Sequence, residues 1–258
     1  MADVLTAEGL SKHFGGLIAV DKVDFRIKKN ETAGIIGPNG SGKTTFFNLL
    51  SGFFPPTAGR VAFFEENITH LPPNKRVMKG MVRTFQLISV FDSISVWENL
   101  VLSSIRFKRQ LTTPWKFLLS PAKKQTIRDN CSDALRTVGL EAKAQTPTSE
   151  LSYGFKRMLE IGMALSLNPK LLLLDEPLSG LSDFEISDVL KILDRIKQDL
   201  TLIIIEHKLS KIVDLVDRLC VMNEGKFICE GDPEQVLNDT AVRECYWGKS
   251  ADTGVWSS

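Results

Sequence analysis

Residues 32–52 read TAGIIGPNGSGKTTFFNLLSG, and this stretch decides the fold. It starts as a short apolar run, passes through a glycine-rich loop and continues into a second apolar segment that Gly52 can terminate. Gly37 to Thr44 match the spacing GxxxxGK(S/T), which requires a strand before the loop and a helix after it. The stretch therefore predicts a strand, a tight loop and a helix in succession.

The residue types in this loop suit a phosphate ligand. Glycines let backbone N–H groups curve around phosphate oxygens, and the start of a helix adds the positive end of its dipole. Lys43 supplies a cation for the β- and γ-phosphates, and the Thr44 hydroxyl can reach Mg²⁺. The alternative is a glycine turn that fits the spacing by chance, and the flanking strand and helix favour the nucleotide loop. The loop residues assigned to the nucleotide are Asn39, Gly40, Ser41, Gly42, Lys43, Thr44 and Thr45.

Two adjacent acidic residues follow a second apolar run, LLLLDE at 171–176. At the carboxyl end of a buried strand, Asp175 can hold Mg²⁺ through water, and Glu176 can act as the base that orients attacking water. Taken alone, the pair could simply begin a loop. Next to a phosphate loop, it favours nucleotide hydrolysis.

The remaining pattern predicts an α/β fold. Residues 4–30 alternate apolar and polar side chains in two runs, as antiparallel strands with one wet face do. MVRTF, LLLLD and TLIII are short runs without alternation, which is typical of parallel strands covered on both faces. Residues 183–199 have helical spacing, residues 95–166 are mostly helical in period, and residues 219–230 resemble a hairpin. We expect a sheet domain with an inserted helical lobe.

Composition excludes several classes of protein. The 258 residues carry 32 Lys and Arg against 31 Asp and Glu, so no strong attraction to nucleic acid or anionic lipid follows. No apolar stretch approaches the length of a membrane-spanning helix, and the first residues do not resemble a secretory signal, so we expect a cytoplasmic chain. The four cysteines lack CxxC spacing and are interpreted as reduced thiols rather than metal ligands.

Six motifs occur in a characteristic order. They are GPNGSGKTT, RTFQ, LSYGF, LLLLDEP, SGLS and IIIEH. In these motifs the chain resembles the ATP-binding subunits of ABC transporters, and the resemblance covers nearly its whole length. It implies that Gln86 senses Mg²⁺ and the attacking water, that His207 contacts the γ-phosphate, and that Phe14 is the platform for adenine, with Val20 in the same nucleotide site. Taken singly, Phe14 is better interpreted as an ordinary apolar residue at a strand edge, and His207 could be a structural histidine.

The resemblance also implies a fold. It is an α/β P-loop NTPase (RecA-like) core with a mainly parallel sheet, an N-terminal antiparallel β subdomain and an inserted helical subdomain. We expect one domain over residues 1–258. Residues 1–90 and 167–240 would form the nucleotide-binding core with the β subdomain, residues 91–166 the helical subdomain, and residues 241–258 a C-terminal tail.

The LSYGF segment forms an anion site of its own. Ser152 is a good N-cap for the helix that follows, and a helix start with Ser152 and Gly154 favours an anion. In the family this site grips the γ-phosphate bound to the opposite subunit, so Ser152 and Gly154 are assigned in trans. Tyr153 and Phe155 replace the usual glycine and glutamine, and Ser182 stands where aspartate is common. In the implied dimer, each ATP lies between the phosphate loop of one subunit and the LSYGF segment of the other. We therefore expect the ATP site completed by this chain's LSYGF segment to be weaker than the site that holds this chain's own ATP.

Several segments resemble one branch of the family, the branched-chain amino acid and urea or amide importers. The implied partners are two permease subunits, a second ATPase subunit and, indirectly, a solute-binding protein; no nucleic acid is expected. ATP and Mg²⁺ are the implied cofactors, and the inner face of the cell membrane is the implied location. Residues 104–124 mix basic and aromatic side chains, which suits a lipid or permease surface, although a solvated helical hairpin is the favoured interpretation.

Two other functions stay open at this stage. One is a soluble regulator or nucleic-acid-associated ABC ATPase that uses the same dimer as a clamp. The other is a degenerate nucleotide-binding partner with little hydrolysis, although the retained Glu176 and His207 argue against it. The transported solute is not encoded in this chain, because the solute does not touch the ATPase subunit in the implied architecture.

Overall fold

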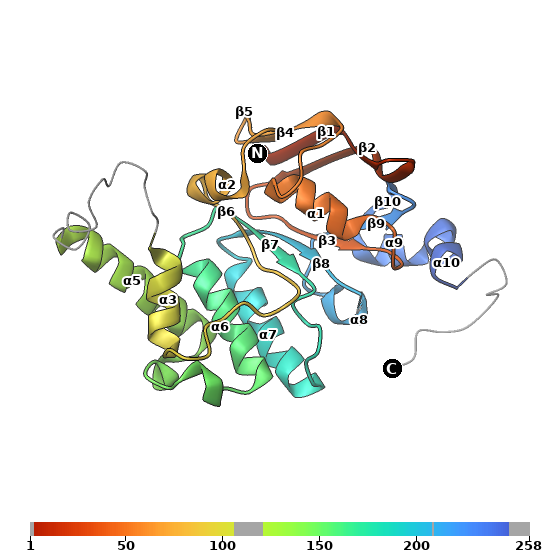
Figure 1. The fold of residues 1–258 in the computed structure, drawn as a ribbon. Helices are drawn as coiled ribbons and strands as arrows, with labels where there is room; N and C mark the ends of the chain where they lie inside the picture. Colours follow the sequence, from red (N-terminus) through yellow and green to blue (C-terminus); the bar gives the residue numbers. More distant parts are fainter. Residues whose placement is uncertain (1–2, 106–120, 208, 248–258) are drawn as a thin grey trace.

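The structure is a computed structural model that describes residues 3–105, 121–207 and 209–247. Two sheets and a set of helices make up the fold (Figure 1). Both predicted sheets are present. Residues 106–120 of the predicted insert at 104–124, and residues 248–258 of the predicted tail, lie outside the described residues.

The N-terminal sheet is antiparallel, as the alternating pattern predicts. Its order is β2-β1-β4-β5. The strands are β1 (Asp3–Phe14), β2 (Leu17–Lys28), β4 (Ala58–Phe63) and β5 (Glu66–Asn67). The sequence pattern predicted β1 and β2 of this sheet but did not predict β4 and β5.

The second sheet is mainly parallel and has the order β10-β9-β3-β8-β7-β6. Only β10 runs antiparallel to its neighbour, as the second strand of the predicted hairpin. Strands β3, β7 and β8 are buried at every residue, which is why their sequences show no alternation. The strands are β3 (Thr32–Ile36), β6 (Met81–Arg83), β7 (Leu171–Asp175), β8 (Thr201–Ile205), β9 (Arg218–Asn223) and β10 (Lys226–Gly231).

The helices surround the parallel sheet, and the described residues between β6 and β7 include α-helices, as the helical period of residues 95–166 predicts. Ser152 caps α6 by accepting a hydrogen bond from the Phe155 amide. The α-helices are α1 (Lys43–Ser51), α2 (Pro73–Lys79), α3 (Val96–Ser104), α5 (Pro121–Val138), α6 (Tyr153–Leu165), α7 (Asp183–Ile196), α8 (Leu209–Ile212), α9 (Pro233–Asn238) and α10 (Thr240–Trp247). Two 3₁₀ turns, at Glu141–Lys143 and Thr148–Glu150, lie between α5 and α6.

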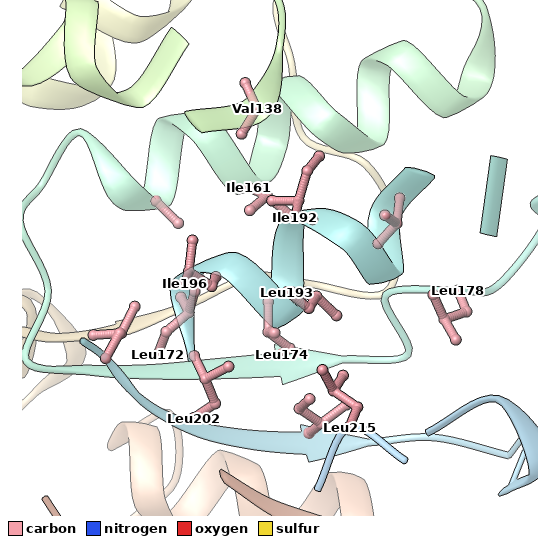
Figure 2. Close-up of a cluster of buried hydrophobic side chains, with 14 of the residues drawn as sticks. Val138, Ile161, Leu172, Leu174, Leu178, Ile192, Leu193, Ile196, Leu202 and Leu215 are labelled. Atoms are coloured by element: carbon pink, nitrogen blue, oxygen red, sulfur yellow. The ribbon is translucent and has the colours of Figure 1, made fainter. Parts of the chain in front are cut away.

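Two apolar cores hold these layers together. One lies between the antiparallel sheet and the parallel sheet and includes Phe25, Phe46 and Ile35. The other joins the opposite face of the parallel sheet to the helical lobe. Figure 2 shows this second core, where Leu193 of α7 lies near Leu172 and Leu174 of β7 while Ile161 of α6 and Val138 of α5 approach from the far side. Helix α6, which begins within the LSYGF segment (residues 151–155, hereafter the signature), is therefore fixed to the sheet through α7.

No helix among the described residues is both long enough and apolar enough to span a membrane. The four cysteines are free thiols, and Cys131 and Cys220 are buried. No group of three or more His, Cys, Asp or Glu side chains in the described ranges is arranged to hold a metal ion.

Candidate nucleotide site

Several predicted site residues gather where four neighbouring parallel strands end. The loop from Gly37 follows β3, Gln86 follows β6, and His207 follows β8. Asp175 ends β7 and Glu176 comes directly after it. Since β3, β8, β7 and β6 are adjacent in the sheet, their carboxyl ends meet at one edge, which is where α/β sheets bind ligands.

The glycine loop is built by close backbone approaches. Gly42 has φ +106°, and a Cβ there would lie 2.4 Å from the Ala19 carbonyl oxygen, so no other residue fits. Helix α1 starts at Lys43 and has no side-chain cap. Its first amides are therefore available to a phosphate.

Lys43 is folded back into this loop. Its Nζ donates hydrogen bonds to the carbonyl oxygens of Gly37 and Pro38 at 2.8 and 2.9 Å, and the side chain is buried. Burial lowers the pKa of Lys43, while Glu176 and Asp175 oppose that shift. The ammonium thus sits inside the cradle, within the field of both carboxylates.

Asp175 forms a buried ion pair that the sequence did not predict. Arg83 donates to Asp175 Oδ2 at 2.7 Å, and the two side chains are 7% and 5% exposed. Arg83 also donates to Asn48 Oδ1 and Ser51 Oγ of α1, at 2.7 and 3.0 Å. The carboxylate at the end of β7 is thereby fixed to the helix that carries the phosphate loop. A lone arginine in a buried strand was the available signal, since such a charge requires a partner.

Glu176 lies between the two polar residues predicted to act with it. Gln86 Nε2 donates to its Oε2 at 2.8 Å, and His207 Nε2 lies 2.7 Å from its Oε1. The Glu176 backbone is left-handed, with φ +48°, and its amide donates to Ile205 O. A non-glycine residue in this conformation is strained and typical of functional sites. The structure therefore brings together Gln86, Glu176 and His207.

A buried carboxylate beside this group was also missed. Glu206 accepts hydrogen bonds from the Leu178 amide at 2.7 Å and the His207 amide at 3.1 Å. It ties the loop after β7 to the loop after β8, which fixes Glu176 relative to His207.

Phe14 is exposed at the end of β1, as a base platform requires. Its ring is 44% exposed, meets Phe54 edge to face at 5.7 Å, and lies 5.1 Å from Lys12 Nζ. The Val20 side chain, in contrast, is fully buried in the core beneath the N-terminal sheet. Val20 pairs with Lys12 in the N-terminal sheet, and its place in the nucleotide site stays a prediction.

The signature residues lie at the start of α6. Ser152 Oγ accepts from the Phe155 amide at 3.3 Å, and the Gly154 amide donates to Glu185 Oε1 at 3.0 Å. Tyr153 is exposed, and Lys143 Nζ lies 4.7 Å from the centre of the Phe155 ring. The Ser182 of the SGLS motif caps α7 in a capping box with Glu185. A serine followed by glutamate three residues later was the local signal for this box.

The donor set fits a magnesium ion. Thr44 is exposed and offers a hydroxyl, Asp175 offers a carboxylate, and Gln86 offers the oxygen of the amide whose nitrogen binds Glu176. Oxygen ligands of this kind are what Mg²⁺ prefers.

The chain is similar to known transport ATPases over almost its whole length. The family model described as ABC transporter matches residues 20–179. The chain is 34% identical over 254 residues to the high-affinity branched-chain amino acid transport ATP-binding protein BraF of Pseudomonas aeruginosa, covering 96% of this chain and 98% of that protein. It is 33% identical over 255 residues to LivG of Escherichia coli K12, a protein of the same description, with the same coverage.

Two further matches extend the comparison. The lipopolysaccharide export system ATP-binding protein LptB of Haemophilus influenzae is 32% identical over 247 residues, covering 95% of this chain and 98% of that protein. Among solved structures, the ADP conformation of MJ1267, an ATP-binding cassette of an ABC transporter, superposes with a TM-score of 0.84 at 33% identity, covering 96% of this chain and 100% of that one.

Proposed function

Because the chain belongs to the ABC transporter family, we propose that its ATP hydrolysis powers an importer of branched-chain amino acids. It is the ATP-binding and hydrolysing subunit of a transporter, as its match to that family and to transport ATPases over 96% of its length shows. The solute assignment rests on BraF and LivG, whose descriptions name branched-chain amino acids.

One observation carries the catalytic proposal, namely that Glu176 is held between Gln86 and His207 at 2.8 and 2.7 Å. Glu176 would accept a proton from the attacking water as general base, and His207 would orient the γ-phosphate. Lys43, released from the loop carbonyls, would stabilise the charge that develops on the phosphate. Bound Mg²⁺ would neutralise charge on the β- and γ-phosphates, held by Thr44, Gln86 and, through water, Asp175.

The signature supports a dimer in which each ATP lies between two subunits. Ser152 and Gly154 stand at a helix start whose hydrogen bonds run to Phe155 and Glu185 rather than to this chain's own phosphate loop. We therefore assign them to the γ-phosphate held by a second ATPase subunit, of the same or a different kind. Two permease subunits, a solute-binding protein and a peripheral position on the inner face of the membrane complete the proposal, with the domain boundaries of residues 1–90, 91–166 and 167–240 retained.

Glu176→Gln tests the catalytic role. The variant keeps the shape of the site but loses the base, so we expect it to bind ATP, to dimerise more persistently and to hydrolyse ATP at least about a hundredfold more slowly. Steady-state phosphate release and size-exclusion chromatography with Mg·ATP measure both effects. Glu141→Gln, at an exposed position in the helical lobe, is the control. Near wild-type turnover in Glu176→Gln would remove Glu176 from this role.

Uptake measurements test the solute. Cells that lack this chain should lose uptake of labelled leucine, isoleucine and valine, and the wild-type chain should restore it while Glu176→Gln should not. Urea uptake and lipopolysaccharide transport are measured in the same cells. Loss of lipopolysaccharide transport alone would favour the second candidate, an export system, which the 32% identity to LptB supports. Unchanged leucine uptake contradicts the branched-chain assignment.

A further inference from the structure

The Glu185 side chain, in the first turn of α7, connects α7 to the start of α6. Its Oε2 accepts hydrogen bonds from the backbone amide and the hydroxyl of Ser182, at 3.0 and 2.8 Å. Its Oε1 accepts a hydrogen bond from the Gly154 amide at 3.0 Å, 31 residues away in the chain. One carboxylate therefore caps its own helix and also occupies an amide of the signature.

Capping alone does not account for the second contact, because α3 has the same cap without it. Ser95 and Glu98 form an equivalent capping box, in which Glu98 Oε2 accepts from the Ser95 amide and hydroxyl at 2.8 and 2.9 Å. Among the hydrogen bonds of the described residues, those that reach the Glu98 carboxylate all come from Ser95. The bond from Gly154 to Glu185 is an additional feature of α7.

The fit at Gly154 is close. A Cβ on this residue would lie 2.5 Å from Glu185 Oε1, so a side chain there would displace the carboxylate. Gly154 is buried, although Ser152 and Tyr153 beside it are exposed. Tyr153 makes a neighbouring contact, since a Cβ on Gly180 would lie 3.0 Å from its ring. The signature thus lies close to Gly180 through Tyr153 and to Glu185 through Gly154.

The charges explain why the carboxylate stays there. The start of a helix favours an anion, and α6 has no acidic residue in its own first turn, so Glu185 supplies the negative charge. Hydrogen bonds from Ser182 and from the Gly154 amide lower the pKa of Glu185, so the group is ionised at neutral pH. A carboxylate and a phosphate oxygen compete for the same N–H.

We propose that Glu185 is a positioning residue that fills the anion site at Gly154 in the isolated chain, and that it must turn away before the γ-phosphate held by a second subunit can bind there. This inference rests on the dimer in the proposed function. When the two subunits close around ATP, the γ-phosphate replaces the Glu185 carboxylate at the Gly154 amide. Part of the attraction between the signature and ATP is therefore used to displace the carboxylate. Removal of the Glu185 carboxylate should make closure easier.

The contact itself is testable in the full-length chain without any partner. The Gly154 amide is followed by ¹H–¹⁵N NMR in wild type, Glu185→Ala and Glu98→Ala while inorganic phosphate is added. We expect the Gly154 resonance to shift in Glu185→Ala and to respond to phosphate there, and to stay insensitive to phosphate in wild type and Glu98→Ala. An identical Gly154 response to phosphate in wild type and Glu185→Ala overturns the inference. Glu98→Ala removes a matched capping box, so it controls for loss of the cap.

The consequence for closure is measured in the Glu176→Gln background, where ATP persists. We expect Glu185→Ala to lower the Mg·ATP concentration for half-maximal dimerisation about fivefold, because a hydrogen bond to a charged group no longer has to be exchanged. Glu185→Gln keeps an acceptor oxygen without the charge and should fall between. Glu98→Ala should not differ from Glu176→Gln alone. An unchanged or raised ATP requirement in Glu185→Ala contradicts the competition.

The two proposals fail in different ways. If Glu176→Gln neither binds ATP nor associates, the proposed function is wrong whatever Glu185 does. If it binds ATP but this chain pairs only with a different ATPase subunit, the phosphate response of the Gly154 amide still decides the role of Glu185.

Discussion

Single buried charges set much of the geometry at the residue scale. Asp175 would be a costly group at the end of β7 if Arg83 did not pair with it, because a buried carboxylate without a partner loses its hydration. Arg83 in turn lies 5.5 and 5.3 Å from the ring centres of Phe47 and Phe85, which cover the guanidinium. The position of the carboxylate near the phosphate loop therefore depends on Arg83, the first residue of the RTFQ motif.

Arg83→Met tests this dependence. The change leaves Asp175 buried and unpaired, so we expect the free energy of unfolding to fall by about 3–5 kcal/mol. Arg83→Met combined with Asp175→Asn should regain part of the loss, since no buried charge is then left alone. Urea denaturation measures both. Arg60→Met is the control, because its ion pair with Glu8 is exposed and should contribute little. Equal effects of Arg83→Met and Arg60→Met would contradict the argument.

At the scale of elements, α6 contacts the RTFQ segment that contains Gln86 and also carries the signature. Arg157, on the buried side of α6, donates to the carbonyl oxygens of Phe85 and Gln86 at 3.2 and 2.9 Å. Its ion pair with Glu160 is 2.6 Å long and almost completely buried. Helix α6, which Ser152 caps, therefore also holds the backbone of Gln86. Because the Gln86 side chain binds Glu176, a movement of α6 would be passed on to Glu176.

Glu160 predicts a specific pH dependence. Burial raises the pKa of Glu160 above its ordinary value of 4.5, while Arg157 opposes the shift. Between pH 4.5 and the raised pKa, the folded state keeps a proton that the unfolded state has lost, so this group makes stability fall as pH rises. Glu160→Gln removes that term. The stability of Glu160→Gln relative to wild type should therefore rise with pH over this window, measured by urea denaturation at several pH values. A difference that is constant or falls with pH contradicts it.

Elements were predictable where the signal is local. Strands β3, β7 and β8 are buried at every residue, so their sequences are unbroken apolar runs. Ser152 is an N-cap residue and indicates the start of α6. Strands β4 and β5 were missed, because β4 is exposed along its first half and β5 has only two residues. The pairs Arg83 with Asp175 and Gly154 with Glu185 were missed for another reason. Each joins residues far apart in the chain, and only the packing of β6 on β7 and of α6 on α7 brings them together.

At the scale of the whole molecule, the two apolar cores lie on opposite faces of the parallel sheet, and the polar site residues lie at the carboxyl ends of its strands. The phosphate loop leads into α1, which packs in one core, whereas the signature lies at the start of α6 in the other core, and Arg157 of α6 holds the Gln86 backbone. A nucleotide held at the strand ends would therefore contact elements from both. Ligand binding to the folded state alone raises its stability by an amount that depends on ligand concentration.

Lys43→Ala tests this coupling. At a Mg·ATP concentration of about one hundred times its Kd, the wild-type chain should gain about 2.7 kcal/mol of unfolding free energy. Lys43 is the cation of the phosphate loop, so Lys43→Ala should lose most of the ATP-dependent gain at the same concentration. Its nucleotide-free stability is measured separately, since Gly37 and Pro38 lose a donor. Lys191→Ala, an exposed lysine on α7, should keep the full gain. An ATP-dependent gain that survives in Lys43→Ala would place the nucleotide elsewhere than this loop.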